Sequence, residues 1–296
     1  MHRFAFTLIE LIFVIVVMGI LAKFGVEFLA QAYNSFIFSS VNNALQSKSE
    51  MAAEAIASRL QYRIKDSVIA KQTDGSYQAL ASNTDLTAPI LEWIGTDIDG
   101  FRGASNTQPL WSGIIDLDAS TAPSILLSPG TNTTALSGII NSLSSNGTTI
   151  NDIVLYFTGS DSDIQTGYGW GGAITTQNVA LHPVKPVVGQ VNQFESSLAL
   201  VDFSNVDVYE YYQLSWTAYA VGIDDYDAAS KTGTLKLWYD YQPWKGETYA
   251  NGTSIKIMDN VSTFRFKAAG SIIKIEVCVN SDLVEDYSLC KEKTVF

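Results

Sequence analysis

A single acidic residue, Glu10, lies at the start of an apolar run that contains no other charge as far as Ala22. A carboxylate at bilayer depth costs about 2.5–3.5 kcal/mol on insertion scales, so an isolated acid in such a segment indicates a function. An ordinary export signal gains nothing from this acid. A subunit that leaves the membrane and pairs the acid with a positive charge on its neighbour does. The segment therefore predicts a chain that assembles through its membrane helix.

Residues 5–10 (AFTLIE), followed by a long apolar helix, resemble the N-terminus of the type IV pilins and of the pseudopilins of type II secretion. In that family a prepilin peptidase cleaves before the phenylalanine, on the cytoplasmic side, and methylates the new amine. The resemblance implies cleavage between Ala5 and Phe6, N-methylation of Phe6, and Glu10 as the fifth residue of the mature chain. The family usually has glycine before the cut, where this chain has alanine.

The physical properties of the segment agree with the resemblance. The leader, residues 1–5, carries Arg3, and a cation there favours retention of that end in the cytoplasm. Residues 6–22 would extend for about 26 Å as a helix, against about 30 Å for a bilayer core, and apolar side chains continue beyond Lys23. After assembly, the amine of Phe6 and the carboxylate of Glu10 would neutralise each other and set the register of a helix bundle.

Two other interpretations of the N-terminus stay open. One is a Sec signal peptide cleaved after residues 30–32 (AQA), although Glu10 would then lie in its apolar region and Lys23 and Glu27 would precede the cut. The other is a plain signal anchor that holds an unrelated periplasmic domain.

The first helix is predicted to continue far beyond the membrane, over residues 6–72. No proline occurs before Pro89, and apolar residues recur at spacings near three, four and seven as far as Val68. Asp74 and Gly75 supply a stop. A helix of this length needs partners along its length, which the membrane, other subunits and the head would supply. The alternative is a break near residues 42–43 followed by a second helix.

Residues 73–296 are predicted to form a periplasmic, β-rich head. The expected fold is therefore α+β and pilin-like, with a long N-terminal helix packed on an antiparallel sheet. Residues 73–152 are rich in Gly, Ser, Thr, Asn and Pro and are predicted to be an irregular connecting segment with a few short strands. Alternating apolar residues predict an antiparallel meander with strands at 153–158, 211–221, 234–241, 254–258, 261–267 and 271–279.

The order of these features also resembles the larger minor pseudopilins of the J type and their counterparts in type IV pili. The resemblance lies in a long head that carries residues 238–241 (WYDY), a strand at 261–266 (VSTFRF) and a final strand near the C-terminus. A head of this size is large for a subunit repeated along a whole fibre. The chain is therefore expected to be a minor component near the filament tip.

Composition limits the partners that the head can have. The formal net charge is −12, and no basic stripe is present, so no nucleic-acid partner is expected. The expected partners are membrane lipid before assembly, the prepilin peptidase, the inner-membrane assembly platform, and other pilins or pseudopilins. The expected location is the bacterial inner membrane, with a cytoplasmic leader and a periplasmic head, and then the pilus or pseudopilus.

The two cysteines, Cys278 and Cys290, are predicted to form a disulfide, which an oxidising periplasm would preserve. The bond would attach residues 286–296 to the sheet. Two free thiols or a metal site are the alternatives, but a head with one histidine offers no convincing set of four zinc ligands.

Clustered aspartates indicate candidate calcium ligands, because a hard cation prefers oxygen donors. Asp224, Asp225 and Asp227 are the first candidates, followed by the pairs at 97 and 99, 116 and 118, and 161 and 163. None completes an EF-hand loop. The alternative for each is a solvated turn in which the aspartate accepts backbone hydrogen bonds.

Enzymatic motifs are not found in the sequence. The histidine of the head, His182, precedes a proline and is predicted to lie in a loop, and no G-x-S-x-G elbow is present. A non-enzymatic filament subunit is therefore expected. The alternatives are a membrane-anchored binding module or adhesin that uses Tyr168 and Trp170 in an exposed loop, residues 167–172 (GYGWGG), and an anchored hydrolase with paired carboxylates.

Overall fold

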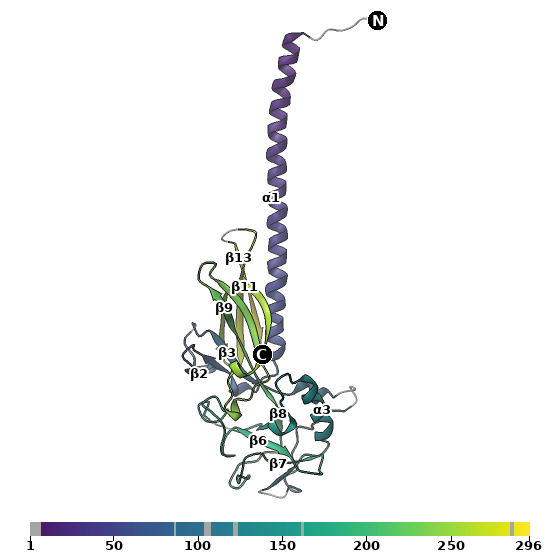
Figure 1. Ribbon diagram of the computed structural model, residues 1–296, viewed down its shortest axis with the longest axis vertical. Helices are drawn as coiled ribbons and strands as arrows, with labels where there is room; N and C mark the ends of the chain where they lie inside the picture. The colour runs from purple at the N-terminus through teal and green to yellow at the C-terminus, as the bar shows by residue number, and fades with distance from the viewer. Residues whose placement is uncertain (1–6, 86, 104–107, 121–123, 161–162, 285–286) are drawn as a thin grey trace.

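The structure is a computed structural model that describes residues 7–85, 87–103, 108–120, 124–160, 163–284 and 287–296. Figure 1 shows one long helix, α1, whose first half extends away from the rest of the chain. The second half of α1 lies along a large sheet, and a second lobe lies beyond its C-terminal end. The expected α+β fold, with a long N-terminal helix packed on an antiparallel sheet, is confirmed.

Helix α1 spans Leu8–Leu60 without interruption, so the alternative break near residues 42–43 is absent. Thr7 caps its N-terminus, because its hydroxyl accepts a hydrogen bond from the main-chain nitrogen of Glu10 at 3.4 Å. The buried side chains recur every three or four residues and so form one stripe, the packed stripe: Val41, Leu45, Ser49, Ala52, Ala53, Ile56, Ala57 and Leu60. This stripe is the face of α1 that contacts the sheet.

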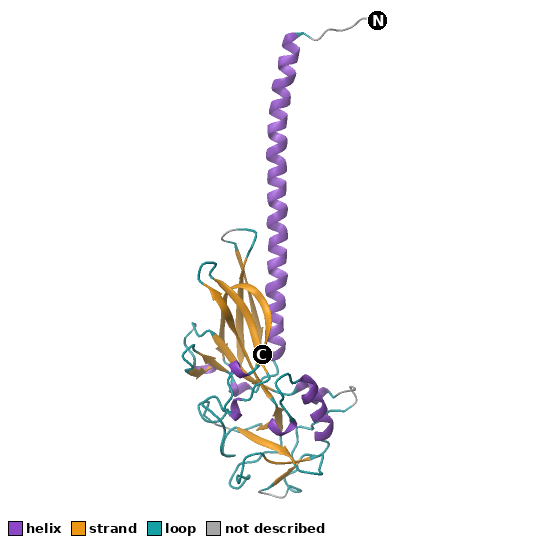
Figure 2. Ribbon diagram, in the orientation of Figure 1, coloured by secondary structure: helices purple, strands orange, loops and turns teal. Residues whose placement is uncertain are grey.

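The large sheet has eight antiparallel strands in the order β13-β12-β11-β10-β9-β3-β1-β2. Figure 2 shows α1 lying against one face of it, where the helix contacts β13, β12 and β11 and touches β3. Alternate residues of a strand point to opposite faces, so the buried residues from Ile273 to Val279 in β12 meet the packed stripe. The strands are β1 (Ile69–Lys71), β2 (Tyr77–Ala79), β3 (Ile90–Gly95), β9 (Thr217–Asp227), β10 (Thr232–Tyr239), β11 (Thr253–Ala269), β12 (Ile272–Asn280) and β13 (Ser288–Val295).

The second lobe is an insertion between two neighbouring strands of the large sheet. Strand β3 ends at Gly95, which pairs with Thr217 at the start of β9, so the intervening chain leaves and returns at the same point. This lobe contains a five-stranded antiparallel sheet in the order β4-β7-β6-β5-β8. Its elements are α2 (Ile98–Arg102), β4 (Ile125–Leu127), α3 (Thr133–Leu143), β5 (Val154–Phe157), β6 (Leu181–Pro186), β7 (Gln193–Ser196) and β8 (Tyr212–Ser215). Short 3-10 helices lie at Lys65–Ser67, Leu80–Ser82, Ile150–Asp152, Pro243–Lys245 and Tyr249–Asn251.

Buried polar groups fasten the two lobes to each other. The carboxylate of Asp240, at the end of β10, is fully buried and accepts hydrogen bonds from the loop after α3. Its donors are the hydroxyls of Ser144 and Thr148 and the main-chain nitrogens of Ser145 and Asn146, at 2.6–2.9 Å. Because every donor comes from the inserted lobe, the contact holds that lobe against the large sheet.

A second buried acid, Asp97, lies at the neck where the insertion begins. It accepts hydrogen bonds from the indole nitrogens of Trp111 and Trp216 and from the main-chain nitrogen of Gly100. Burial raises the pKa of Asp97 to about 6, and these hydrogen bonds oppose that shift. Asp97 thus holds the neck through its hydrogen bonds, and calcium binding by Asp97 with Asp99 stays a prediction.

The predicted helix over 6–72 is too long. Beyond Leu60 the main chain turns to meet the end of β3: Thr96 donates a hydrogen bond to the carbonyl of Tyr62, and Ile64 donates one to the carbonyl of Ile94. Strand β1 then occupies 69–71. The apolar residues beyond Leu60, as far as Val68, do keep a helical spacing. They are buried by tertiary contacts and do not belong to a helix. The segment 73–152 is correspondingly more regular than predicted, since it contains β2, β3, β4, α2 and α3.

The prediction of one meander was wrong, because the strands belong to two sheets. The predicted strand 211–221 divides at Trp216 into β8 and β9, one in each sheet, while 254–258 and 261–267 form the single strand β11. Strand β6 was not predicted because two prolines, Pro183 and Pro186, argue against a strand. His182 therefore lies on a buried strand and not in a loop.

A buried cation closes the C-terminal end of α1. The side chain of Arg63 donates hydrogen bonds to the carbonyls of Leu60 and Ser271, both at 2.9 Å, and to the main-chain oxygen of Phe296 at 3.3 Å. Burial lowers the pKa of Arg63. One side chain thus joins the end of α1, the turn between β11 and β12, and the end of β13.

We expect Arg63→Met to lower the free energy of unfolding by about 3 kcal/mol or more, because a hydrogen bond to a charged group contributes about 1.5–3 kcal/mol and three oxygens lose their donor. Urea denaturation of the detergent-purified chain, followed by circular dichroism, measures the change. The control is Arg265→Met, an exposed arginine on β11, which should change stability by no more than about 0.5 kcal/mol. Equal losses in the two variants would contradict the role given to Arg63.

Candidate assembly interface

The first half of α1 is exposed along its whole length. Residues 8–36 are exposed and mostly apolar, and Figure 1 shows them extending away from both lobes. Among the described residues, α1 is the one helix that is long and apolar enough to cross a membrane. The chain therefore carries a single apolar N-terminal helix that suits a membrane anchor or a signal.

Glu10 is exposed in the first turn of this helix. It is the only charged residue between Thr7 and Ala22. The positive end of the helix dipole favours an acid at this position, and the capping hydroxyl of Thr7 fixes the local main chain. The carboxylate is thus held at the end of α1 where a second chain can reach it. Ala5 and Phe6, the predicted cleavage and methylation positions, lie outside the described residues.

The exposed apolar surface of α1 is longer than a membrane is thick. Residues 8–36 extend for about 44 Å, against about 30 Å for the hydrocarbon core. Beyond Lys23, the side chains of Phe24, Phe28, Tyr33 and Phe36 are each at least 65% exposed. An apolar patch of this extent indicates a surface that another molecule covers.

Strand β13 attaches the second half of α1 to the sheet. The ammonium of Lys291 lies 3.5 Å from Glu50, and that of Lys293 lies 2.6 Å from Glu54. Two residues of a strand rise about 6.8 Å and four residues of a helix about 6 Å, so the two ion pairs match in spacing. Each exposed pair contributes at most about 1 kcal/mol, so the packed stripe supplies the stability and the ion pairs fix the register.

The predicted disulfide is confirmed. Cys278 of β12 and Cys290 of β13 lie directly opposite each other and are bonded. The bond attaches the C-terminal tail to the sheet as expected, and the tail forms a full strand over Ser288–Val295. Asp286, where the tail was predicted to begin, lies outside the described residues.

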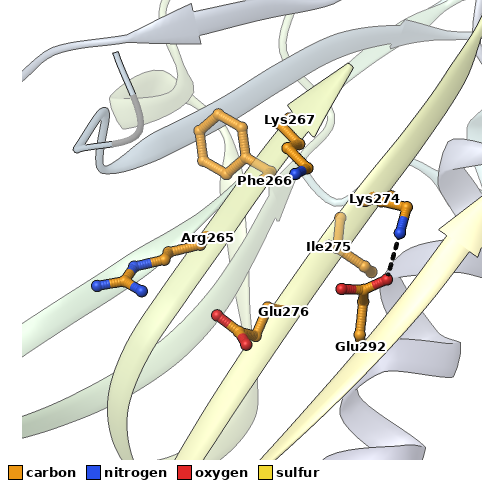
Figure 3. Close-up of a pocket in the computed structure, with 7 residues that line it drawn as sticks. All are labelled: Arg265, Phe266, Lys267, Lys274, Ile275, Glu276 and Glu292. Carbon is orange, nitrogen blue, oxygen red and sulfur yellow. Dashed lines mark hydrogen bonds and ion pairs between the residues drawn. The ribbon is translucent and has the colours of Figure 1, made fainter. Parts of the chain in front are cut away.

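The outer face of β11, β12 and β13, away from α1, carries a shallow hollow of about 230 Å³. Figure 3 shows its charged side chains, with an ion pair of 2.7 Å between Lys274 and Glu292. Arg265 stands opposite Glu276 in the strand register. The hollow is thus a sheet face of mixed charge, because the register also places Lys267 opposite Lys274 and Glu276 opposite Glu292.

The structure brings Asp224 and Asp225 together, but around a lysine. Both carboxylates lie 2.8 Å from the ammonium of Lys236, and their hydrogen bonds raise the pKa of Lys236 to about 12. Asp227 instead accepts hydrogen bonds from the main chain of residues 229 and 230 in the turn. Calcium binding at the three aspartates stays a prediction, and it would require Lys236 to move away.

Two of the other candidate ligands, Asp116 and Asp163, accept hydrogen bonds from the main-chain nitrogens of Ala119 and Gln165, and calcium binding there stays a prediction. The one group of three ligating atoms within 4.8 Å of one another is Glu276 with the two cysteines, whose sulfurs are bonded to each other. Asp161 lies outside the described residues.

The loop at 167–172 was predicted to expose its aromatic side chains, and this was wrong. Tyr168 is 1% exposed, and the indole nitrogen of Trp170 donates a hydrogen bond to the carbonyl of Ser67 at 3.0 Å. Gly169 has a φ of +81°, and a Cβ there would lie 2.5 Å from the main-chain nitrogen of Trp244. Gly169 therefore permits close packing of the loop against Trp244.

Comparisons of the chain with protein-family models, with curated proteins and with solved structures return no match. The architecture is nevertheless pilin-like. The second half of a long apolar N-terminal helix packs on an antiparallel sheet, and the first half is uncovered.

We expect the double variant Cys278→Ala and Cys290→Ala to lower the free energy of unfolding by about 3 kcal/mol, the loop-closure contribution of a bridge that spans about a dozen residues. Urea denaturation with and without a thiol reductant measures the effect. The reductant should lower the stability of the unmodified protein to that of the variant and leave the variant unchanged. A reductant-insensitive wild type whose thiols have become titratable would contradict this.

Proposed function

We propose that this chain is a non-enzymatic structural subunit, a minor pilin or pseudopilin, of a type IV pilus or a type II secretion pseudopilus. The observation that supports this most is the division of α1. Its second half is covered by the head, whereas its first half presents an uncovered apolar surface with one acid near the end. A subunit that moves from lipid into a helix bundle needs both properties.

Lipid covers this surface only in part before assembly. The apolar part of α1 exceeds the hydrocarbon thickness by about 14 Å, which leaves the aromatic side chains near Tyr33 at or beyond the membrane surface. Helices of neighbouring subunits would cover these side chains along their whole length. A plain signal anchor gains nothing from an apolar surface of this length, so the excess favours a filament subunit.

Glu10 gives the assembly step its register. Its carboxylate is costly in a bilayer, by about 2.5–3.5 kcal/mol, and a charge partner at the same depth offsets that cost. We propose the amine of Phe6 on the neighbouring pilin as this partner, after the prepilin peptidase has cleaved the leader at Ala5 in the inner membrane. The assembly platform would then draw the subunit out of the membrane with its head in the periplasm.

The inserted lobe supports a position near the filament tip. It lies beyond the C-terminal end of α1, at the opposite end of the molecule from the first turn of that helix. A bulky lobe at this end is more easily accommodated where few subunits stack above it. The competing function, an adhesin that uses Tyr168 and Trp170, loses its basis because Tyr168 is buried.

We expect Glu10→Ala to remove the chain from filaments while leaving it in the membrane, because the apolar helix still inserts but the charge partner is lost. Immunoblots of sheared filaments and of membrane fractions from the producing cells measure the distribution. The matched control is Glu27→Ala, an exposed acid on the same helix that pairs with Lys23, and it should enter filaments at the wild-type level. Normal incorporation of the Glu10 variant would refute the proposal.

Mass spectrometry of the mature chain is expected to find an N-methylated phenylalanine, Phe6, at the N-terminus and no trace of residues 1–5. The two other interpretations of this segment predict different masses. A cleaved Sec signal gives a chain that begins at Tyr33, and a plain anchor gives one that begins at Met1.

A further inference from the structure

Strand β11 has a different neighbour along each of its two halves. In the order of the large sheet, β11 lies between β10 and β12. Its first half, from Thr253 to Val261, pairs with β10, and its second half, from Val261 to Ala269, pairs with β12. Among the strands that the structure describes, none therefore pairs with residues 253–260 along the edge that faces away from β10.

This open edge exists because β12 ends too early to cover it. Val279 of β12 lies opposite Val261, and the strand ends one residue later. The chain then turns towards β13, and the main-chain nitrogen of Ser281 donates a hydrogen bond to the carbonyl of Tyr287. A strand that continued β12 in the same line would pair with residues 254–260.

The main-chain groups on the open edge lack partners. Alternate residues of a strand direct their N–H and C=O groups to opposite edges, so about half of these groups in residues 253–260 point away from β10. Outside the ladder with β10, the described residues make no main-chain hydrogen bond to this segment. A row of unpaired donors and acceptors is a template for a further strand.

A groove of about 690 Å³ lies between the open edge and α1. Residues 255–260 line one side of it, and residues of α1 from Leu45 to Arg59 line the other. Six strand residues extend for about 20 Å and this part of α1 for about 21 Å, so the groove suits a segment of about six extended residues. Two of its apolar side chains remain uncovered, since Met51 is 61% exposed and Ile255 is 50% exposed.

The side of the groove formed by α1 carries two cations, Lys48 and Arg59. Neither forms an ion pair with a carboxylate among the described residues. The guanidinium of Arg59 instead lies over the ring of Tyr219, 5.9 Å from its centroid. Both cations are therefore available to an acidic side chain of an occupant.

The two acids of the groove already have partners. A hydrogen bond from Lys256, whose ammonium lies 2.8 Å away, lowers the pKa of Asp259, and the charge of Lys48 adds a smaller effect from farther away. Asp282 accepts a hydrogen bond from the amide of Asn260. The cations of α1 thus favour an acidic occupant over a basic one.

We propose that this groove, the β11 groove, binds an extended, acidic peptide segment of another chain. The segment adds to β11 as an antiparallel strand along residues 254–260, in line with β12. Its main chain pairs with the open edge, its alternate apolar side chains cover Met51 and Ile255, and its acidic side chains meet Lys48 and Arg59. The inference does not depend on how the first half of α1 assembles.

The test uses the full chain purified in detergent and two synthetic peptides with blocked ends, TVEVEVT and TVKVKVT. Fluorescence anisotropy measures their affinities, and hydrogen–deuterium exchange with mass spectrometry locates the bound peptide. We expect saturable binding of the acidic peptide, at least tenfold tighter than that of the basic one, with slower exchange within residues 254–260. The net charge of −12 opposes this preference, so the preference reports the groove itself. No saturable binding, equal binding of the two peptides, or protection elsewhere would overturn the proposal.

Two further probes distinguish a strand from other occupants. Acidic peptides with N-methyl groups on either set of alternate residues keep their side chains, but in one of them the donors that face β11 are lost. Binding of that peptide should be abolished, and unchanged binding of both methylated peptides would contradict strand addition. A helical peptide of residues 23–38 of this chain should leave the exchange of residues 254–260 unchanged. Protection by it would mean that the groove holds a helix.

Two sets of variants locate the site. Lys48→Gln combined with Arg59→Gln should weaken binding of the acidic peptide about tenfold, and Ile255→Thr, at an exposed position, should weaken it severalfold. The matched control combines Arg265→Gln with Lys267→Gln, two exposed cations of the second half of β11, and should bind as the wild type does. Equal losses in the groove variants and in the control would exclude the β11 groove.

Discussion

The contact between the packed stripe of α1 and the large sheet is the interaction on which the rest of the structure depends. A helix in a protein gains most of its stability from the packing of its apolar face, and a sheet must bury its apolar face against another element. Side chains such as Ile56 and Leu60 meet the inward residues of β12 and bury both surfaces at once. Arg63, the disulfide and the two lysines of β13 then fix where the helix ends and how the last strand lies against it.

This contact also separates the two tasks of α1. Because the head covers only the second half, the first half keeps its apolar surface and the acid Glu10 exposed. In the proposed function, lipid and then other helices would cover this first half without any change in the head. The inserted lobe, which leaves and returns between β3 and β9, adds a second structure without disturbing the sheet. Asp240 and Asp97 hold it in place.

Much of the fold followed from local pattern. The three- and four-residue spacing predicted α1, and the alternation predicted β10, β11 and β12, because each pattern reflects the burial of one face of one element. The pair of cysteines predicted the disulfide. The sequence signals failed where a contact joined distant segments. Residues 61–72 kept an apolar spacing that fitted a helix, but pairing with β3 decided their structure. The aromatic loop at Tyr168 was expected to be exposed because its glycines suggested flexibility, whereas Gly169 allows close approach to Trp244.

The sequence by itself determined that the chain has a long, apolar helix with one acid at its start, because hydropathy and charge are local properties of a segment. It also determined that a β-rich head follows. Only the tertiary structure decided which strands share a sheet, that the chain between Gly95 and Thr217 forms a separate lobe, and that His182 lies buried on β6. Strand pairing and burial depend on segments far apart in the sequence, and the alternation along one strand does not predict which strand pairs with it.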